Sequence, residues 1–237
     1  MPHCGFGNRL LYYYNLRQEA HERSCKFLSA PWDGHEHFEG DLLGNYKMGD
    51  KIEYEALEFC LGDRFFKYNN LSTRDVFKLK NKPKVPDGTC AIHFRGTDFH
   101  SWNPDSILSK QYYFDAIEKV IDQKNFSNFI LFTDDEGLES YTSVLELFDN
   151  YSIGVKYSTG ENVSNRSNYI KDFALMSECD WIISSPSTFC IASGFIGKNK
   201  KIIHSKEWIM NRINKNDKFW KDLYNGGNQN YSLWGLI

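Results

Sequence analysis

The distribution of hydrophobic and polar residues after residue 88 predicts a series of buried strands separated by helices. Five short apolar runs, rich in β-branched and aromatic residues, have the length and composition of strands. They are GTCAIHF (88–94), NFILFT (128–133), IGVKYS (153–158), DWIISS (180–185) and KKIIH (200–204). Strands that alternate with helices form parallel βαβ units with helices on both faces of the sheet. This part of the chain is therefore predicted to be an α/β, Rossmann-like unit.

Most of the segments between these runs have the spacing of amphipathic helices. The two clearest are QYYFDAIEKVIDQ (111–123), with Phe114, Ile117 and Ile121 on one face, and YIKDFALMSECD (169–180), with Ile170, Phe173 and either Met176 or Leu175 on one face. A further helix is expected at CIASGFIG (190–197), directly after a Ser- and Thr-rich turn.

The first 85 residues have a different pattern, which predicts a smaller α/β lobe. The expected elements are a helix at GNRLLYYYNLRQEAHERS (7–24), a short strand at KFLSAP (26–31), a loop at PWDGHEHFEGDLLGNYKMGD (31–50) and a linker at NKPKVPDG (81–88). Two prolines and a glycine in the last of these favour a turn or linker. We therefore expect an N-terminal lobe over residues 1–85 and a C-terminal lobe over residues 86–237.

Composition narrows the class of protein without identifying its function. Of the 237 residues, 41% are hydrophobic and 16% aromatic, which is typical of a folded globule. A net charge of −3 favours neither a nucleic-acid partner nor an anionic membrane surface. Neither a run long enough to span a bilayer nor a basic-then-apolar leader is visible, so we expect a cytoplasmic protein without a membrane span. The six cysteines lack a CxxC motif and are interpreted as reduced thiols rather than zinc ligands.

Three side chains capable of chemistry follow the first apolar run. His93, Arg95 and Asp98 lie at the end of CAIHFRGTDF (90–99). Ligands of open parallel sheets bind just beyond the carboxyl ends of the strands, so this is where a ligand is expected. Arginine carries a permanent charge and a fork of N–H donors that matches phosphate oxygens. The alternative is an ion pair between Arg95 and Asp98 within the loop.

Two further segments favour an anionic ligand. SSPSTF (184–189) follows a predicted strand and opens a predicted helix, so its backbone N–H groups and hydroxyls, with Ser187 among them, can face an anion. The alternative is a plain helix cap. In GFGNR (5–9), Gly5 and Gly7 allow a close backbone approach, but the third glycine of a nicotinamide-binding GxGxxG motif is missing.

The sequence offers no convincing metal site. It contains no Asp-x-Asp, and TDDE (133–136) presents adjacent rather than alternating carboxylates. His35 and His37, with Asp33 and Glu36, are interpreted as a solvated loop because no second ligand group has a suitable spacing. If a diphosphate binds, Arg95 and the Ser187 turn are the groups that would neutralise it.

Four motifs in order resemble the α-1,2/α-1,6-fucosyltransferase superfamily. They are GFGNRL, HFRGTD, FILFTDDEGLES and DFALMSECDWIISSPSTF, and together they extend over about residues 5–197. The resemblance implies a GT-B-like α/β fold of two Rossmann-like lobes, with the donor site in the C-terminal lobe. It also implies metal-independent transfer of L-fucose from GDP-fucose to a glycan hydroxyl, with inversion at the anomeric carbon and no cofactor.

The resemblance also implies roles for individual residues. Arg95 would bind the β-phosphate with His93 beside it, and Ser187 and Thr188 would contact the phosphates. Asp172 would recognise the guanine edge, and Asp134 would lie near the nucleotide. The residues that would line the cleft from the N-terminal lobe are Gly5, Gly7 and Asn8. Asp98 is a candidate general base, with Asp105 and His100 behind it on the same loop. The alternative role for Asp98 is to orient Arg95.

Three departures from the family pattern leave alternatives open. No apolar strand precedes GFGNR, CIASGF replaces the usual Trp-rich tail, and the chain is short for a GT-B enzyme. These features predict a truncated N-terminal lobe or one domain of a larger chain. The alternative functions are the same chemistry with a rhamnose, xylose or mannose donor, and a non-catalytic protein that binds GDP or a glycan.

Overall fold

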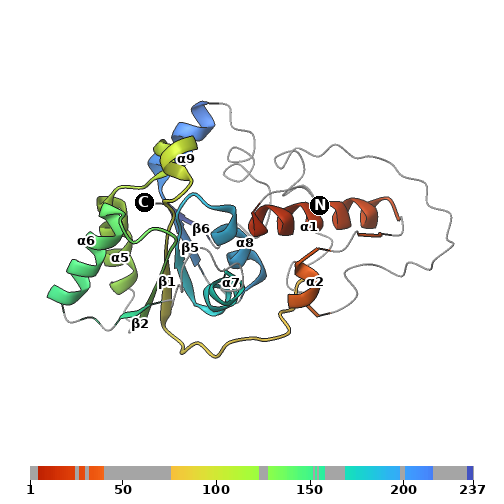
Figure 1. The fold of residues 1–237 in the computed structure, drawn as a ribbon, viewed down its shortest axis with the longest axis horizontal. Coiled ribbons are helices and arrows are strands. Elements are labelled where there is room, and N and C mark those ends of the chain that lie inside the picture. Colours follow the sequence, from red (N-terminus) through yellow and green to blue (C-terminus); the bar gives the residue numbers. More distant parts are fainter. Residues whose placement is uncertain are drawn as a thin grey trace.

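The computed structural model describes most of the second half of the chain and several segments of the first half (Figure 1). The described residues are 5–24, 27–29, 32–39, 76–122, 128–151, 153, 155–157, 169–197, 201–215 and 234–236.

A parallel β-sheet forms the centre of the described structure. Its strands are β1 (Thr89–Phe94), β2 (Asn128–Thr133), β3 (Val155–Tyr157), β4 (Trp181–Ile183), β5 (Lys201–His204) and β6 (Trp234–Leu236). They pair in the order β3-β2-β1-β4-β5-β6, and every pairing is parallel. The predicted α/β architecture with a parallel sheet is confirmed, and each of the five apolar runs contains one strand. The sixth strand, β6, was not among the predicted elements.

The strand order has a switch point between two particular strands. The chain runs outward from β1 through β2 to β3, then returns to β4 on the other side of β1. In open α/β sheets, ligands bind at the carboxyl ends of the strands on either side of such a switch point. A ligand is therefore expected at the carboxyl ends of β1 and β4.

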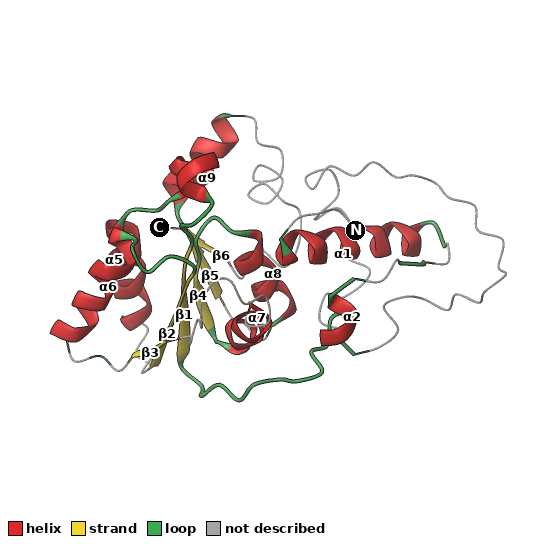
Figure 2. Ribbon diagram, viewed as in Figure 1, coloured by secondary structure: helices red, strands yellow, loops and turns green. Residues whose placement is uncertain are grey.

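Helices cover both faces of the sheet (Figure 2). On one face lie α5 (Lys110–Ile121) and α6 (Glu139–Asn150), and on the other lie α7 (Tyr169–Glu178) and α8 (Thr188–Ile196). Successive strand side chains point to opposite faces. Accordingly the Phe94 ring packs on Tyr113 of α5 at 4.3 Å, whereas Ala91 clusters with Met176 of α7 and Cys190 of α8. Because both faces are covered, the strands are apolar throughout rather than alternating.

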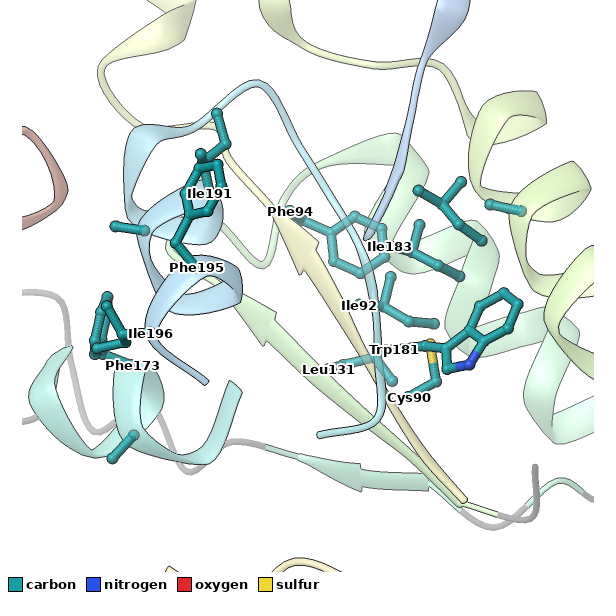
Figure 3. Close-up of a cluster of buried hydrophobic side chains, with 14 of the residues drawn as sticks. Cys90, Ile92, Phe94, Leu131, Phe173, Trp181, Ile183, Ile191, Phe195 and Ile196 are labelled. Carbon is teal, nitrogen blue, oxygen red and sulfur yellow. The ribbon is translucent and has the colours of Figure 1, made fainter. Parts of the chain in front are cut away.

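Figure 3 shows buried side chains of the strands together with those of α7 and α8. The labelled side chains from the strands are Cys90, Ile92, Phe94, Leu131, Trp181 and Ile183, and those from α7 and α8 are Phe173, Ile191, Phe195 and Ile196. All ten are less than a tenth exposed. The strands are therefore anchored in a buried apolar core.

One predicted helical face is partly wrong. In α5, Ile121 is 43% exposed, and the buried residues are Tyr112, Tyr113, Ala116, Ile117 and Val120. The reason is that Tyr113 packs on Phe94 and Tyr112 reaches the ends of β4 and β5, which turns the buried face away from Ile121.

The predicted N-terminal helix is confirmed as α1 (Phe6–Glu22), which lies against α8 (Figure 1). The predicted strand at 26–31 is wrong for residues 27–29, which are irregular. The Phe27 ring packs edge-on against Tyr13 of α1 at 5.2 Å, so its apolar surface is partly buried without a sheet. Residues 26, 30 and 31 lie outside the described residues.

Part of the predicted loop at 31–50 is instead a one-turn helix, α2 (Gly34–His37). The turn forms because Trp32 packs against Tyr13 at 5.4 Å while its carbonyl accepts the His35 N–H. An isolated antiparallel bridge then joins Phe38 to Leu79, just before the linker. Residues 40–75 lie outside the described residues, so the division into lobes at about residue 85 stays a prediction.

The linker reaches the sheet through a glycine turn. Gly88 has φ 72°, a left-handed conformation that side chains rarely adopt, and its N–H donates to Asp180 Oδ2 at 2.7 Å. Among the described residues, no helix is both long and apolar enough to cross a membrane.

Candidate functional site

Three loops leave the carboxyl ends of the neighbouring strands β2, β1 and β4. The loop after β1 carries Arg95 and Asp98, the loop after β2 carries Asp134 and Asp135, and the turn after β4 runs from Ser184 to Ser187. The sequence therefore brings its predicted charged and hydroxyl groups to one edge of the sheet, as the parallel topology requires.

Arg95 is held by two carboxylates. Its guanidinium is 2.7 Å from Asp98 Oδ1 and also pairs with Asp134 Oδ2, and its Cζ lies 5.7 Å from the centre of the Phe99 ring. The side chain is 33% exposed. The alternative interpretation of this loop, an ion pair between Arg95 and Asp98, is thus present in the structure, with Asp134 as a second partner.

Asp134 anchors the turn that carries Arg95. Its Oδ1 accepts the Gly96 N–H at 2.8 Å, and its Oδ2 accepts the Thr97 hydroxyl at 2.8 Å. The resemblance implied a place near the nucleotide, and the structure places Asp134 in direct contact with the predicted phosphate-binding arginine. Both carboxylate oxygens are engaged there, which fixes the turn.

Asp98 orients Arg95 in this structure. One carboxylate oxygen pairs with the guanidinium, and the other accepts the Trp102 indole N–H at 3.1 Å. Both carboxylate oxygens therefore hold donors, and one of these donors is the Arg95 guanidinium. Of the two roles considered for Asp98, the geometry favours the orienting one.

His93 is buried and neutral. Burial, followed by the charge of Arg95, lowers the pKa of its imidazole to about 3. Its Nδ1 lies 2.7 Å from Ser185 Oγ, and its ring packs near Phe189 with centroids 6.0 Å apart. His93 therefore joins β1 to the turn after β4 and carries no charge near pH 7.

The turn after β4 is fixed by hydrogen bonds and opens α8. Ser187 caps the helix, with its Oγ accepting the Phe189 N–H at 3.3 Å, and its own N–H donates to the Ser185 carbonyl at 2.7 Å. The Tyr112 hydroxyl donates to the Ser184 carbonyl at 2.8 Å. The predicted capping role of Ser187 is present, and Thr188 is the half-buried first residue of the helix.

The start of α1 lies directly against the start of α8. A Cβ added to Gly7 would lie 2.4 Å from the Phe189 backbone N and 2.5 Å from the Thr188 carbonyl carbon, so only glycine fits. By contrast, Gly5 is exposed, and a Cβ added there would have no atom within 4 Å. Within the part of the chain that is described, the half-buried Asn8 has a buried Oδ1 without a hydrogen-bond partner. Two helix N-termini, each with partial positive charge, therefore meet beside the switch point.

Asp172 lies in the first turn of α7 and is half-buried. In a βαβ unit the helix runs antiparallel to the strands, so α7 begins at the same edge as the loops above. Its first residue is tied to the N-terminal segment, because the Tyr169 hydroxyl donates to Asp33 Oδ2 at 2.7 Å while Arg9 Nε donates to Asp33 Oδ1 at 3.1 Å. Burial raises the pKa of Asp33, but the Tyr169 and Arg9 donors outweigh it and the net pKa is lowered.

Asp33 therefore links the start of α1 to the start of α7. His35 Nδ1 is likewise engaged, since it accepts the Trp32 N–H at 3.1 Å. Within the described ranges, no group of three or more His, Cys, Asp or Glu side chains could hold a metal ion.

A pair that the sequence analysis did not predict completes the edge. His100 Nε2 lies 2.8 Å from Asp135 Oδ2, joining the loop after β1 to the loop after β2. His100 and Asp135 are 35 positions apart in the sequence, so no local pattern pairs them. Asp105, the other residue considered behind Asp98, is exposed and pairs with Lys215 at 3.1 Å.

Asp105 also borders a cleft of about 610 Å³ between the loop before α5 and the start of α9 (Lys206–Asn214). Tyr112 and Trp208 contribute to its lining. Tyr112 bonds the Ser184 carbonyl on its other side, so the cleft lies along the same sheet edge.

Comparison of the chain with models of known protein families and with curated proteins gives no match.

Proposed function

We propose that this protein is an inverting, metal-independent glycosyltransferase that moves L-fucose from GDP-fucose to a glycan hydroxyl. The observation that carries the proposal is that Arg95 follows β1 and the capped start of α8 follows the adjacent strand β4, with the start of α1 against α8. Gly7 touches Thr188 and Phe189, and His93 touches Ser185, although these partners are far apart in sequence. A diphosphate placed there would meet a permanent cation and two helix N-termini.

The chemistry of glycosyl transfer suits this set of groups. When the bond between the sugar and the diphosphate breaks, negative charge develops on the leaving nucleotide. A guanidinium and helix N-termini fixed beforehand near that charge stabilise the transition state without a metal ion. Arg95 supplies the guanidinium, and the more exposed of its two carboxylates, Asp98 at 47%, is the partner that an incoming phosphate would displace.

The remaining assignments belong to the same proposal. Asp172 would accept the guanine N–H groups from the first turn of α7, and His93 would pack beside the nucleotide as a neutral imidazole. The two-lobed GT-B arrangement, with the donor in the C-terminal lobe, is the architecture in which these roles would operate. The parallel α/β sheet supports that architecture without distinguishing it from other Rossmann-like folds.

Isothermal titration calorimetry with GDP, UDP and ADP tests the proposal first. We expect saturable binding of GDP and weaker binding of the other two, because only guanine presents adjacent N–H donors to a carboxylate. Release of GDP from GDP-fucose, with a panel of oligosaccharide acceptors, then tests transfer. Absence of nucleotide binding would contradict the proposal, and binding of GDP without turnover would identify a non-catalytic GDP-binding protein. Turnover of a different nucleotide-sugar would reassign the donor.

A further inference from the structure

His100 and Asp135 form a carboxylate–imidazole pair between the loops after β1 and β2. Nε2 of the imidazole lies 2.8 Å from Asp135 Oδ2, and the two side chains come from the loops after β1 and β2. The His100 side chain is 57% exposed, whereas Asp135 is 24% exposed. The pair therefore has a solvent-facing imidazole and a more enclosed carboxylate.

Asp135 is fixed from several directions. Its Oδ1 accepts the Gly137 N–H at 3.0 Å, and its backbone N–H and carbonyl both bond the Thr133 hydroxyl at 3.0 Å. Its side chain also presses on Gly96, where an added Cβ would lie 2.5 Å from Asp135 Oδ2. The carboxylate is thus packed against the same turn that carries Arg95.

This geometry determines which nitrogen of His100 can accept a proton. A carboxylate at Nε2 favours the tautomer with hydrogen on that nitrogen and leaves the lone pair on Nδ1. The same carboxylate stabilises the imidazolium that forms when Nδ1 takes up a proton. Asp98 pairs with Arg95 and with the Trp102 indole in this structure.

We infer that His100 is the general base of the reaction and that Asp135 is its positioning residue. The inference rests on the proposed function. The acceptor hydroxyl oxygen bonds to the anomeric carbon while its proton passes to His100 Nδ1. The bond from the anomeric carbon to the phosphate oxygen breaks, and its electron pair leaves with the nucleoside diphosphate. The imidazolium then returns the proton to water.

Charged groups also lie on the elements next to His100. They are Arg95 and Asp98 on its own loop, Asp134 and Asp135 after β2, and Asp105 in the adjoining turn. The base must be neutral to accept a proton, so the rate is expected to fall at acidic pH. Asp135→Asn removes a negative charge beside the imidazolium, so the acidic limb of the variant is expected at lower pH than that of the wild type.

The test compares His100→Asn, Asp135→Asn and the control His21→Asn, an exposed histidine in the last turn of α1. Each variant is measured for GDP affinity, for melting temperature and for GDP release from GDP-fucose as a function of pH. His100→Asn is expected to turn over about 10²-fold more slowly or worse than the wild type. The acidic limb of its pH–rate profile is expected to disappear. Its GDP affinity is expected to stay within about threefold of the wild-type value. Asp135→Asn is expected to retain a limb at lower pH, and His21→Asn is expected to behave as the wild type.

A measurement independent of turnover tests the same geometry. Long-range ¹H–¹⁵N spectra of the wild-type protein, assigned with His100→Asn, are expected to show His100 with its proton on Nε2. Because the His100 side chain is exposed, its replacement is expected to leave the core intact, so a folded but inactive protein is a clear result.

The outcomes separate the inference from the proposed function. Turnover by the wild type together with undiminished turnover by His100→Asn would overturn the inference and leave the transferase intact. A proton on Nδ1, or an unshifted profile in Asp135→Asn, would overturn the positioning role of Asp135. Failure of the wild type to bind GDP, or to release it from GDP-fucose, would overturn both.

Discussion

The two sides of the candidate site differ in charge and in burial. After β1 and β2 the edge is charged and partly exposed, with Arg95, Asp98 and Asp134 in one ion-pair network. After β4 the edge is neutral and enclosed, with Ser184 0% and Ser185 1% exposed. The charged side can exchange one partner for another at little cost, since its groups are already in contact with water. The neutral side cannot rearrange without leaving polar groups unpaired.

This difference assigns a separate task to each side. The neutral side forms a preorganised support, in which the turn after β4 is held by Tyr112, His93 and its own backbone. The charged side supplies the cation and presents the carboxylates that a bound anion would displace. Binding energy is therefore expected to depend mainly on the charged side, and stability mainly on the neutral side.

The largest expected effect is on the charged side. Arg95→Ala is expected to reduce turnover of GDP-fucose at least about a hundredfold, because one preorganised cation at the leaving group is removed. GDP release measured under saturating donor checks it. Arg23→Ala, which removes an arginine paired with Glu19 at the far end of α1, is the matched control. Near-normal turnover in Arg95→Ala would show that the charged side does not act on the leaving group.

The junction of α1 with the neutral side is tested by a pair of glycines. Gly7→Ala is expected to destabilise the protein by about 1–3 kcal/mol, because the new methyl group overlaps the backbone of Thr188 and Phe189. Gly5→Ala, with open space around its Cβ, is expected to change stability by less than about 0.5 kcal/mol. Urea unfolding of the two variants provides the comparison. Equal stability would mean that α1 does not pack on α8 as described.

The neutral side also predicts a dependence of stability on pH. Burial, followed by the charge of Arg95, lowers the pKa of His93 to about 3, and burial lowers the pKa of His204 to about 3. The unfolded chain protonates these histidines near pH 6.5, while the folded protein does not. Stability is therefore fully present above about pH 6.5 and falls as the pH drops toward 3, by up to about 1.4 kcal/mol per pH unit for each histidine.

Urea unfolding between pH 7.5 and about pH 4.5 measures this slope. His93→Gln is expected to have a shallower slope than the wild type, because one of the two buried imidazoles is gone. An unchanged slope in the variant would show that His93 is accessible to protons in the folded state.

The smallest expected effect is that of metal removal. With Arg95 and two helix N-termini available for the diphosphate, the rate of GDP release is expected to be the same with and without EDTA. If EDTA abolishes activity and Mg²⁺ or Mn²⁺ restores it, the carboxylates of the charged side bind a metal ion instead of pairing with Arg95.

The sheet could be predicted from the sequence because its determinants are local. Runs such as NFILFT are apolar throughout, and buried parallel strands require this composition. The predicted strand containing Phe27 and the exposed Ile121 of α5 show where local pattern fails. In both cases a contact with a distant aromatic residue, Tyr13 with Phe27 and Phe94 with Tyr113, decides which surface is buried.

The candidate site was predictable only in part for the same reason. The placement of Arg95 and Ser187 at one edge follows from the rule for parallel sheets. The roles of Asp134 as an anchor of the Arg95 turn and of Asp135 as the partner of His100 depend on how two loops meet in space. The link from Asp33 to Tyr169 joins residues 136 positions apart, and no local pattern indicates it.

The contact of Gly7 with the start of α8 has a consequence for biosynthesis. The surface that receives α1 is encoded about 180 residues later, so α1 leaves the ribosome well before its docking site exists. At ordinary elongation rates this interval is on the order of 10–40 s. During that time α1 lacks the helix on which its first turn packs in the folded protein.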